Sequence, residues 1–196
     1  MLADKDAAPI AIVGSETGSL FLDPLRLDED SGQLVNMVQM GDGAGAIVLG
    51  PQSGSGAALE ACWFGTAGLG RSPGIQLKSG AMEFEHDFAA VAAHGPALIA
   101  TGANVLHSMG YPLERLDILV PHQASGRAAK QVADGFGLSP DRVFGNAARI
   151  GNTGSAAIWL ALAELRETAM PSGTTVAALG AEASKYMHGG FVYRHG

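Results

Sequence analysis

Beyond Gly56 the chain alternates short apolar runs with longer stretches of helical composition. The runs predict strand, helix, strand, helix, short strand, helix and two final strands, in the segments ALEACWFGTAG, residues 83–109, LDILVP, SGRAAKQVADGFG, LSPDRVFGNAA, GNTGSAAIWLALAELRET, TTVAALGAE and GGFVYRHG. Such alternation is typical of α/β domains, in which helices cover the faces of a sheet. We therefore predict a layered α/β fold, with a kink or split at Gly95-Pro96 because proline cannot continue the helical hydrogen bonds.

The segments before Gly56 are shorter and richer in glycine. APIAIVGSET predicts a short buried strand that ends in a polar turn, and LFLDPLRLDEDSGQ predicts an acidic, irregular loop. GDGAGAIVLG predicts a tight structural turn before a strand at 46–49, since a nucleotide-binding GxGxxG would need a helix after it. PQSGSGA is the clearest internal boundary, and RSPGIQLKSG, further along, predicts a loop.

Composition excludes several classes of protein. With 196 residues, 47% of them hydrophobic and a net charge of −7, the chain can build a sizeable core but lacks the basic character of a nucleic-acid-binding protein. Its single cysteine excludes a disulfide framework and suits a reducing cytoplasm. No segment has the pattern of a signal peptide or the roughly 18 apolar residues of a membrane-spanning helix. We expect a cytoplasmic protein with no membrane partner.

Two residues stand where chemistry is common in α/β folds. His122 follows the predicted buried strand LDILVP, and Asn152 precedes a predicted helix in GNTGSAAIWLAL. Two neutral donors on adjacent loops can hold one carbonyl oxygen while it becomes an enolate. A histidine in a polar niche and an asparagine that caps a helix are the structural alternatives. In the capped case Thr153 or Ser155 could take over the cap and free the Asn152 amide.

The other reactive side chains give weaker signals. Cys62 lies within a predicted strand, without the helix N-terminus or cationic neighbour that lowers a thiol pKa, so we expect a buried, inert thiol. The remaining histidines have no metal-binding spacing. We therefore predict no metal site.

Taken together, GSETGS, GDGAGAIVL, VPHQA, GNTGSAA and the final glycine-containing strand pair resemble the 3-oxoacyl-acyl carrier protein synthase III family of the thiolase superfamily. The resemblance implies a duplicated, dimeric fold with layers in the order αβαβα. Residues 1–52 would be the tail of the first half, and residues 53–196 would be the second half.

The resemblance also implies a reaction. In the family a cysteine takes an acyl group from acyl-CoA, and a malonyl thioester then loses carbon dioxide and attacks it. His122 and Asn152 match the residues that stabilise the malonyl enolate. Arg127 matches an arginine near the mouth, where it would meet CoA phosphates or the acyl carrier protein, although a solvated helix position explains it equally well. No cofactor beyond acyl-CoA and malonyl-ACP or malonyl-CoA as substrates is implied.

Three departures from the family shape the expectations. The nucleophilic cysteine would precede PIAIVGSE by a few dozen residues, so we expect it on another portion or partner chain, and we expect an obligate homo- or hetero-oligomer. The usual glycine run is replaced by GAEASKYMHGG, where a backbone N–H near Ser184 could still serve the acyl site while Glu182 and Lys185 add charge. Ser125 stands where asparagine is common, and Ile150 where an aromatic or histidine is frequent.

Alternative functions remain open at this point. One is a non-catalytic partner subunit of a condensing enzyme. The other is acyl transfer to an oxygen or nitrogen of a small molecule, without decarboxylation.

Overall fold

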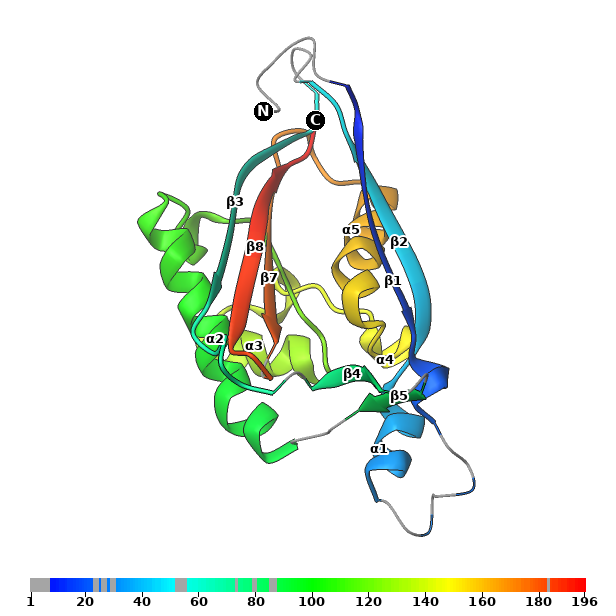
Figure 1. Cartoon of the computed structure of the whole chain (residues 1–196). Coiled ribbons are helices and arrows are strands. Elements are labelled where there is room, and N and C mark those ends of the chain that lie inside the picture. Colours follow the sequence, from blue (N-terminus) through cyan, green and yellow to red (C-terminus); the bar gives the residue numbers. More distant parts are fainter. Residues whose placement is uncertain are drawn as a thin grey trace.

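The structure is a computed structural model, and it describes residues 8–22, 25, 28, 31–51, 56–72, 74–78, 81–84, 88–182 and 184–196. The predicted domain boundary after residue 52 lies outside these residues and stays a prediction. Figure 1 shows the elements and their order in space.

Four strands form the larger sheet, in the spatial order β3-β8-β7-β6. Their bounds are Ala58–Thr66 for β3, Ile118–Pro121 for β6, Thr175–Glu182 for β7 and Met187–Arg194 for β8. β6 runs parallel to β7, while β8 is antiparallel to both of its neighbours. β7 lies inside the sheet and is buried from Val176 to Leu179, as a strand covered on both faces requires.

Helices cover both faces of this sheet (Figure 1). α2 (Phe88–Ser108) and α3 (Ala128–Phe136) lie on one face, and α5 (Ala157–Glu167) lies on the other. Each face has its own apolar core. The first core includes Ile99, Leu106, Leu119, Ala133, Leu179 and Val192, and the second includes Val120, Ala161, Leu165, Val176, Phe191 and Tyr193.

A second, two-stranded sheet packs on the other side of α5 (Figure 1). β1 (Ile10–Thr17) and β2 (Asp42–Leu49) pair antiparallel along their whole length. The molecule is thus layered as helices, four-stranded sheet, α5 and β1–β2 ribbon, which confirms the predicted α/β class. The smaller elements are α1 (Ser31–Gln39), β4 (Ile75–Lys78), β5 (Ala81–Phe84) and α4 (Ala147–Ile150), with 3-10 turns at Gly18–Phe21, Leu113–Arg115, Pro140–Arg142 and Gly154–Ala156.

The glycine-rich segment after residue 41 is strand rather than turn, which corrects the prediction. β2 includes Gly43 and Gly45 because α5 comes too close for side chains there. A Cβ at Gly45 would lie 2.7 Å from the Cβ of Trp159. β1 differs too: it continues through the predicted polar turn to Thr17, and most of it is exposed rather than buried.

Other predicted boundaries also change. β4 lies within the predicted loop at 71–80, and α1 begins within the predicted acidic loop at 20–33. α2 continues through Pro96 as one helix, so the predicted split is wrong. Val143 makes a single bridge to Leu119 instead of a short strand, because α4 follows within a few residues.

The predicted helix at 83–109 begins only at Phe88, and residues 83 and 84 belong to β5 instead. The predicted helix at 151–168 begins at Ala157, after a 3-10 turn. The remaining predicted elements are confirmed, including the end of α3 at Gly137, which has the left-handed φ of +64° that favours glycine. None of the helices in the described part of the chain is both long and apolar enough to cross a membrane.

Candidate active site

His122 follows the carboxyl end of β6, where the apolar run of the strand ends. Its backbone N–H extends the parallel ladder by donating to the Leu179 carbonyl at 2.6 Å. Burial lowers the pKa of the imidazole, and the negative charge of Glu182 opposes this only in part. The ring is therefore uncharged at neutral pH, when one nitrogen donates a hydrogen bond and the other accepts one.

The residue after His122 ties this loop to the segment that leads to Asn152. Gln123 is buried, and its Oε1 accepts the backbone N–H groups of Asn146 and Ala147 at 2.8 and 2.9 Å. These two residues begin α4, which ends directly before Gly151 and Asn152. One side chain thus fixes the His122 loop against the loop that carries Asn152.

The backbone of Asn152 is held by the segment before β2. Its N–H donates to the Gln39 carbonyl at 2.6 Å, and its carbonyl accepts the N–H of Gly41 at 3.0 Å. Gly41 has to be glycine here, since a Cβ would lie 2.0 Å from the carbonyl oxygen of Ile150. The glycine-rich motif therefore positions the Asn152 loop.

Only the oxygen of the Asn152 side-chain amide has a strong hydrogen-bond partner. Its Oδ1 accepts the N–H of Gly154 at 3.1 Å, while its Nδ2 faces the Met40 sulfur at 3.8 Å. Thioether sulfur is a weak acceptor, so the amide can donate to a ligand. Asn152 does not cap α5, because the N-cap position of that helix is Ala156.

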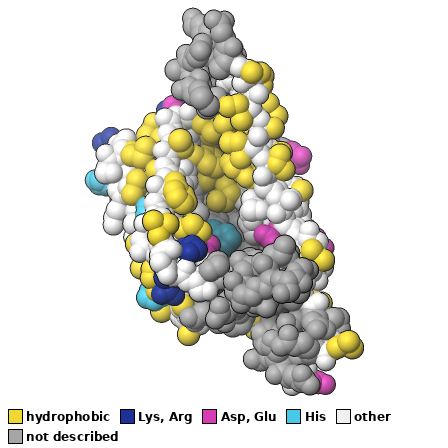
Figure 2. All heavy atoms as spheres, viewed as in Figure 1, with side chains coloured by type: hydrophobic (Ala, Val, Ile, Leu, Met, Phe, Trp, Pro, Cys, Tyr) yellow, Lys and Arg dark blue, Asp and Glu magenta, His cyan; other side chains and the backbone are white. Residues whose placement is uncertain are grey.

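Glu182, at the end of β7, faces the same space as His122. The register pairs Pro121 with Leu179, so His122 lies level with Gly180, and Glu182 is two residues further on the same face. Both residues thus project from the face that α5 covers. Figure 2 shows a hollow between the four-stranded sheet and the β1–β2 ribbon, with histidine and acidic atoms deep inside it.

The turn after β7 folds back onto the Glu182 carboxylate. The backbone N–H groups of Ser184 and Lys185 donate to it at 2.6 and 3.0 Å, so neither is free to bind a substrate oxygen. Burial raises the pKa of Glu182, but these bonds, one from the Ser184 side chain and the interaction with His122 outweigh it, and the net shift is downward. Glu182 is therefore ionised at neutral pH.

A second segment pins the same turn. Arg71 Nε donates to the Ser184 carbonyl at 2.7 Å, and its guanidinium lies 4.2 Å from the ring centre of Tyr186. Lys185 Nζ donates to the carbonyls of Leu69 and Arg71 at 3.1 and 2.6 Å. Tyr186 has a φ of +49°, which these contacts hold. Ala183 lies outside the described residues.

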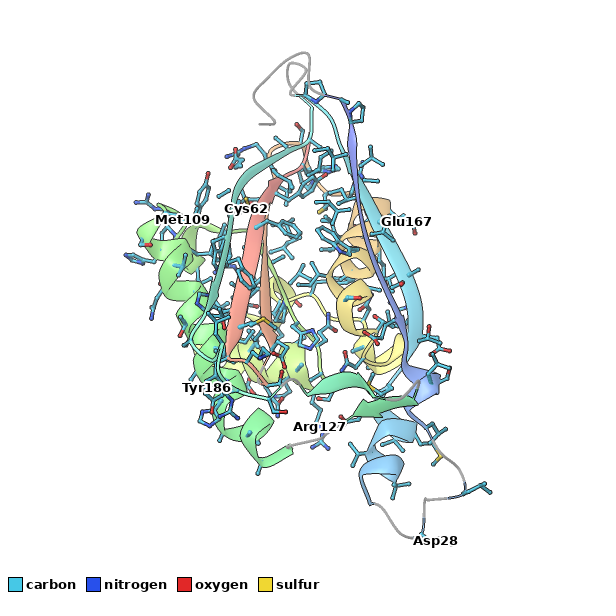
Figure 3. The ribbon with its side chains drawn as sticks, in the orientation of Figure 1. Asp28, Cys62, Met109, Arg127, Glu167 and Tyr186 are labelled. Carbon is cyan, nitrogen blue, oxygen red and sulfur yellow. The ribbon has the colours of Figure 1, made fainter. Side chains whose placement is uncertain are left out.

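The predicted carrier-binding residues occupy the surface at the start of α3. Arg127 is exposed, at the same end of the molecule as the turn between β7 and β8 (Figure 3). Ser125 is half-buried, its carbonyl accepts the N–H of Ala128 at 3.0 Å, and its hydroxyl lies 3.4 Å from the Arg127 nitrogen. The structure places both near the His122 loop without showing what they bind.

Cys62 is exposed, which corrects the prediction of a buried thiol. It lies on the edge strand β3, opposite Phe191, and Figure 3 shows it far along the sheet from Arg127. Its side chain points to the α5 face, but α5 does not extend over β3. Among the described residues, no three histidine, cysteine, aspartate or glutamate side chains form a group that could hold a metal ion.

Sequence comparison finds relatives of this chain. Residues 106–194 match the family model described as 3-oxoacyl-[acyl-carrier-protein (ACP)] synthase III C terminal. The beta-ketoacyl-[acyl-carrier-protein] synthase III 2 of Vibrio cholerae is 31% identical over 168 residues, covering 80% of this chain and 44% of that protein. A synthase III of Pseudomonas aeruginosa (strain LESB58) is 35% identical over 182 residues, covering 86% and 53%. The chain therefore spans about half the length of the curated relatives that it matches.

Comparison with solved structures agrees. The 3-oxoacyl-(acyl carrier protein) synthase III of Pseudomonas aeruginosa PAO1 superposes with a TM-score of 0.77 at 30% identity, covering 95% of this chain and 58% of that one. AbyA1, a tetronic acid condensing enzyme, gives a TM-score of 0.78 at 26% identity, with 96% and 59% covered. The fold is thus thiolase-like, and the chain belongs to the 3-oxoacyl-[acyl-carrier-protein] synthase III family, whose C-terminal portion it matches.

Proposed function

We propose that this chain is the C-terminal portion of a condensing acyltransferase, which joins an acyl thioester to a malonyl thioester with loss of carbon dioxide. One observation carries the proposal: Gln123 holds together the loops of two uncharged donors, His122 and Asn152, in a member of a synthase III family. The exposed position of Arg127 next to Ser125, where a carrier protein could bind, is a weaker argument for the same proposal.

The two donors suit the step in which the malonyl group becomes a nucleophile. When its carboxylate leaves as carbon dioxide, the electron pair moves onto the thioester carbonyl and forms an enolate. Donation from the His122 ring and the Asn152 amide stabilises the developing charge on that oxygen. Each preorganised donor of this kind lowers the activation free energy by ~3 kcal/mol or more. The enolate carbon then attacks the acyl carbonyl carbon, the carbon–sulfur bond of the acyl thioester breaks, and the sulfur leaves with the electron pair as a thiolate.

The acyl group in this scheme is carried by a cysteine outside the described residues, on another portion of the protein or on a partner chain. The apolar hollow between the two sheets supports this placement. Ile10 and Ile12 project toward the α5 layer from β1, yet each is 38% exposed, and Phe64 on β3 is 73% exposed. A cysteine-bearing helix beside α5 would cover these side chains. Acyl-CoA and an acyl carrier protein would then approach the end of the molecule where Arg127 lies.

The test measures the release of carbon dioxide. Release of labelled carbon dioxide from malonyl-CoA should depend on both donors, because decarboxylation requires enolate stabilisation but no acylated cysteine. His122→Ala and Asn152→Ala should each lower the rate by about a hundredfold or more, measured on the protein together with any cysteine-bearing portion that co-purifies with it.

His107→Ala is the matched control, since His107 is exposed near the end of α2. This variant should release carbon dioxide at the unmodified rate. Equal rates in all four proteins would reject the proposal and favour a non-catalytic partner subunit.

A further inference from the structure

The carboxylate of Glu182 is an unusual group to find beside a site that stabilises negative charge. An enolate is destabilised by a nearby anion, so donors for decarboxylation gain nothing from it. Yet the anion is built in rather than accidental, because two backbone N–H groups hold its oxygens and Arg71 and Lys185 hold the turn that supplies them. A fixed carboxylate on the same face of the sheet as a histidine stabilises the imidazolium form of that ring through Coulomb attraction.

We propose that Glu182 is a positioning residue for His122, which allows the imidazole to take a proton from an O–H or N–H acceptor during acyl transfer. The inference deepens the proposed function, since it rests on acyl chemistry at His122. It adds an acceptor class, namely hydroxyl or amine compounds and water, to the carbon nucleophile made by decarboxylation.

The charges around His122 favour this assignment. Among the described residues, Glu182 is the one charged group that shifts the pKa of the ring. The nearby cations are engaged elsewhere: Arg149 with Glu164, and Lys185 with backbone carbonyls. Glu16, on β1, lies at the start of the 3-10 turn before α5, where its carboxylate is 3.5 Å from the Ser155 nitrogen. Among the described residues, these two cations are therefore not free to compete with His122 for Glu182.

The proposed step balances without any further reagent. The oxygen or nitrogen of the acceptor attacks the thioester carbonyl carbon while its proton passes to the unprotonated nitrogen of His122. The carbon–sulfur bond then breaks, the electron pair leaves with sulfur, and the thiolate takes the proton from the imidazolium. Glu182 stays ionised throughout and lowers the energy of the protonated ring.

The first measurement is the titration of His122 by NMR in the purified protein, with His122→Gln used to assign its resonance. Glu182→Gln keeps the shape of the side chain and removes its charge, so the titration midpoint of His122 should move to lower pH. Glu167→Gln removes a charge from the exposed end of α5 and should leave the midpoint unchanged. An unchanged or raised midpoint in Glu182→Gln would overturn the proposal.

The second measurement is hydrolysis of butyryl-CoA, with water as the O–H acceptor and free thiol as the readout. A general base contributes ~10²–10⁴-fold to such steps. Glu182→Gln leaves His122 in place but makes its ring less basic, so hydrolysis should slow by only part of that factor, about tenfold. Release of carbon dioxide from malonyl-CoA should change much less, because it needs His122 only as a donor. Hydrolysis at the unmodified rate would also overturn the proposal.

The two proposals fail separately. If Glu182→Gln leaves the titration midpoint of His122 unchanged while His122→Ala still slows decarboxylation, only the present inference is wrong. If Glu182→Gln shifts the midpoint and slows hydrolysis while His122→Ala spares decarboxylation, the condensing function is wrong and the proton-accepting role of His122 stands.

Discussion

At the scale of single residues, the site depends on side chains that would touch no substrate. Gln123 is 2% exposed, and its side-chain oxygen accepts hydrogen bonds from two backbone N–H groups. The sequence placed His122 correctly after a buried strand, because an apolar run followed by polar residues is a local signal. The role of Gln123 has no such signal, since its partners lie more than twenty residues away.

Gln123→Ala should lower the free energy of unfolding by about 2–4 kcal/mol, because it leaves two buried N–H groups without an acceptor. Urea unfolding of the purified protein measures the change. Gln131→Ala, on the exposed side of α3, is the control and should stay within about 0.5 kcal/mol of the unmodified protein. An equal effect of both substitutions would mean that the Gln123 bonds do not stabilise the fold.

At the scale of elements, the segment around β2 shows where local patterns mislead. Glycine weakens an isolated strand, so GDGAGA predicts a turn when only neighbours in sequence are considered. In the molecule, Gly41 and Gly45 meet the Ile150 carbonyl and the Trp159 side chain, and close packing decides the structure. β7 was predictable because its run VAALGA is long and almost wholly apolar, and the second half of β8 because the apolar residues FVY follow two glycines. β4 and β5, at four residues each, are too short to carry a comparable pattern.

Gly41→Ala tests that packing. The added methyl would collide with backbone at Ile150, which no side-chain rotation relieves, and should destabilise the protein by about 1–3 kcal/mol. Because the N–H of Gly41 holds the Asn152 carbonyl, carbon dioxide release should fall as well.

Gly50→Ala is the matched substitution, as nothing lies within 4 Å of a Cβ there. It should leave thermal unfolding and carbon dioxide release unchanged. A Gly41→Ala protein that matches Gly50→Ala in both measurements would show that the approach of β2 to the Asn152 loop is not tight.

At the scale of the whole molecule, one central helix serves two sheets. α5 packs on both, but Cys62 and Phe64 on β3 remain exposed on the face that it partly covers. Figure 2 shows apolar side chains along the walls of this hollow. Sequence patterns could not reveal it, because a half-buried strand and an uncovered one alternate in the same way. Large apolar surfaces of this kind promote association.

The protein purified without a partner should therefore self-associate, with sedimentation coefficients that rise with concentration. Phe64→Ser should weaken that association, because it removes an aromatic side chain from the hollow. Met109→Ser, at the far end of α2 (Figure 3), should not. A monomer at all concentrations would contradict this expectation.

The contacts among Arg71, Lys185 and Tyr186, which hold the turn after β7, have a consequence for how such a protein can diversify. A segment some 110 residues earlier in the chain contacts the turn behind Glu182. If Glu182 sets the basicity of His122 as proposed, substitutions in that segment would change it without altering His122 or Glu182. Selectivity can then be adjusted by remote changes while the residues that meet the substrate stay the same.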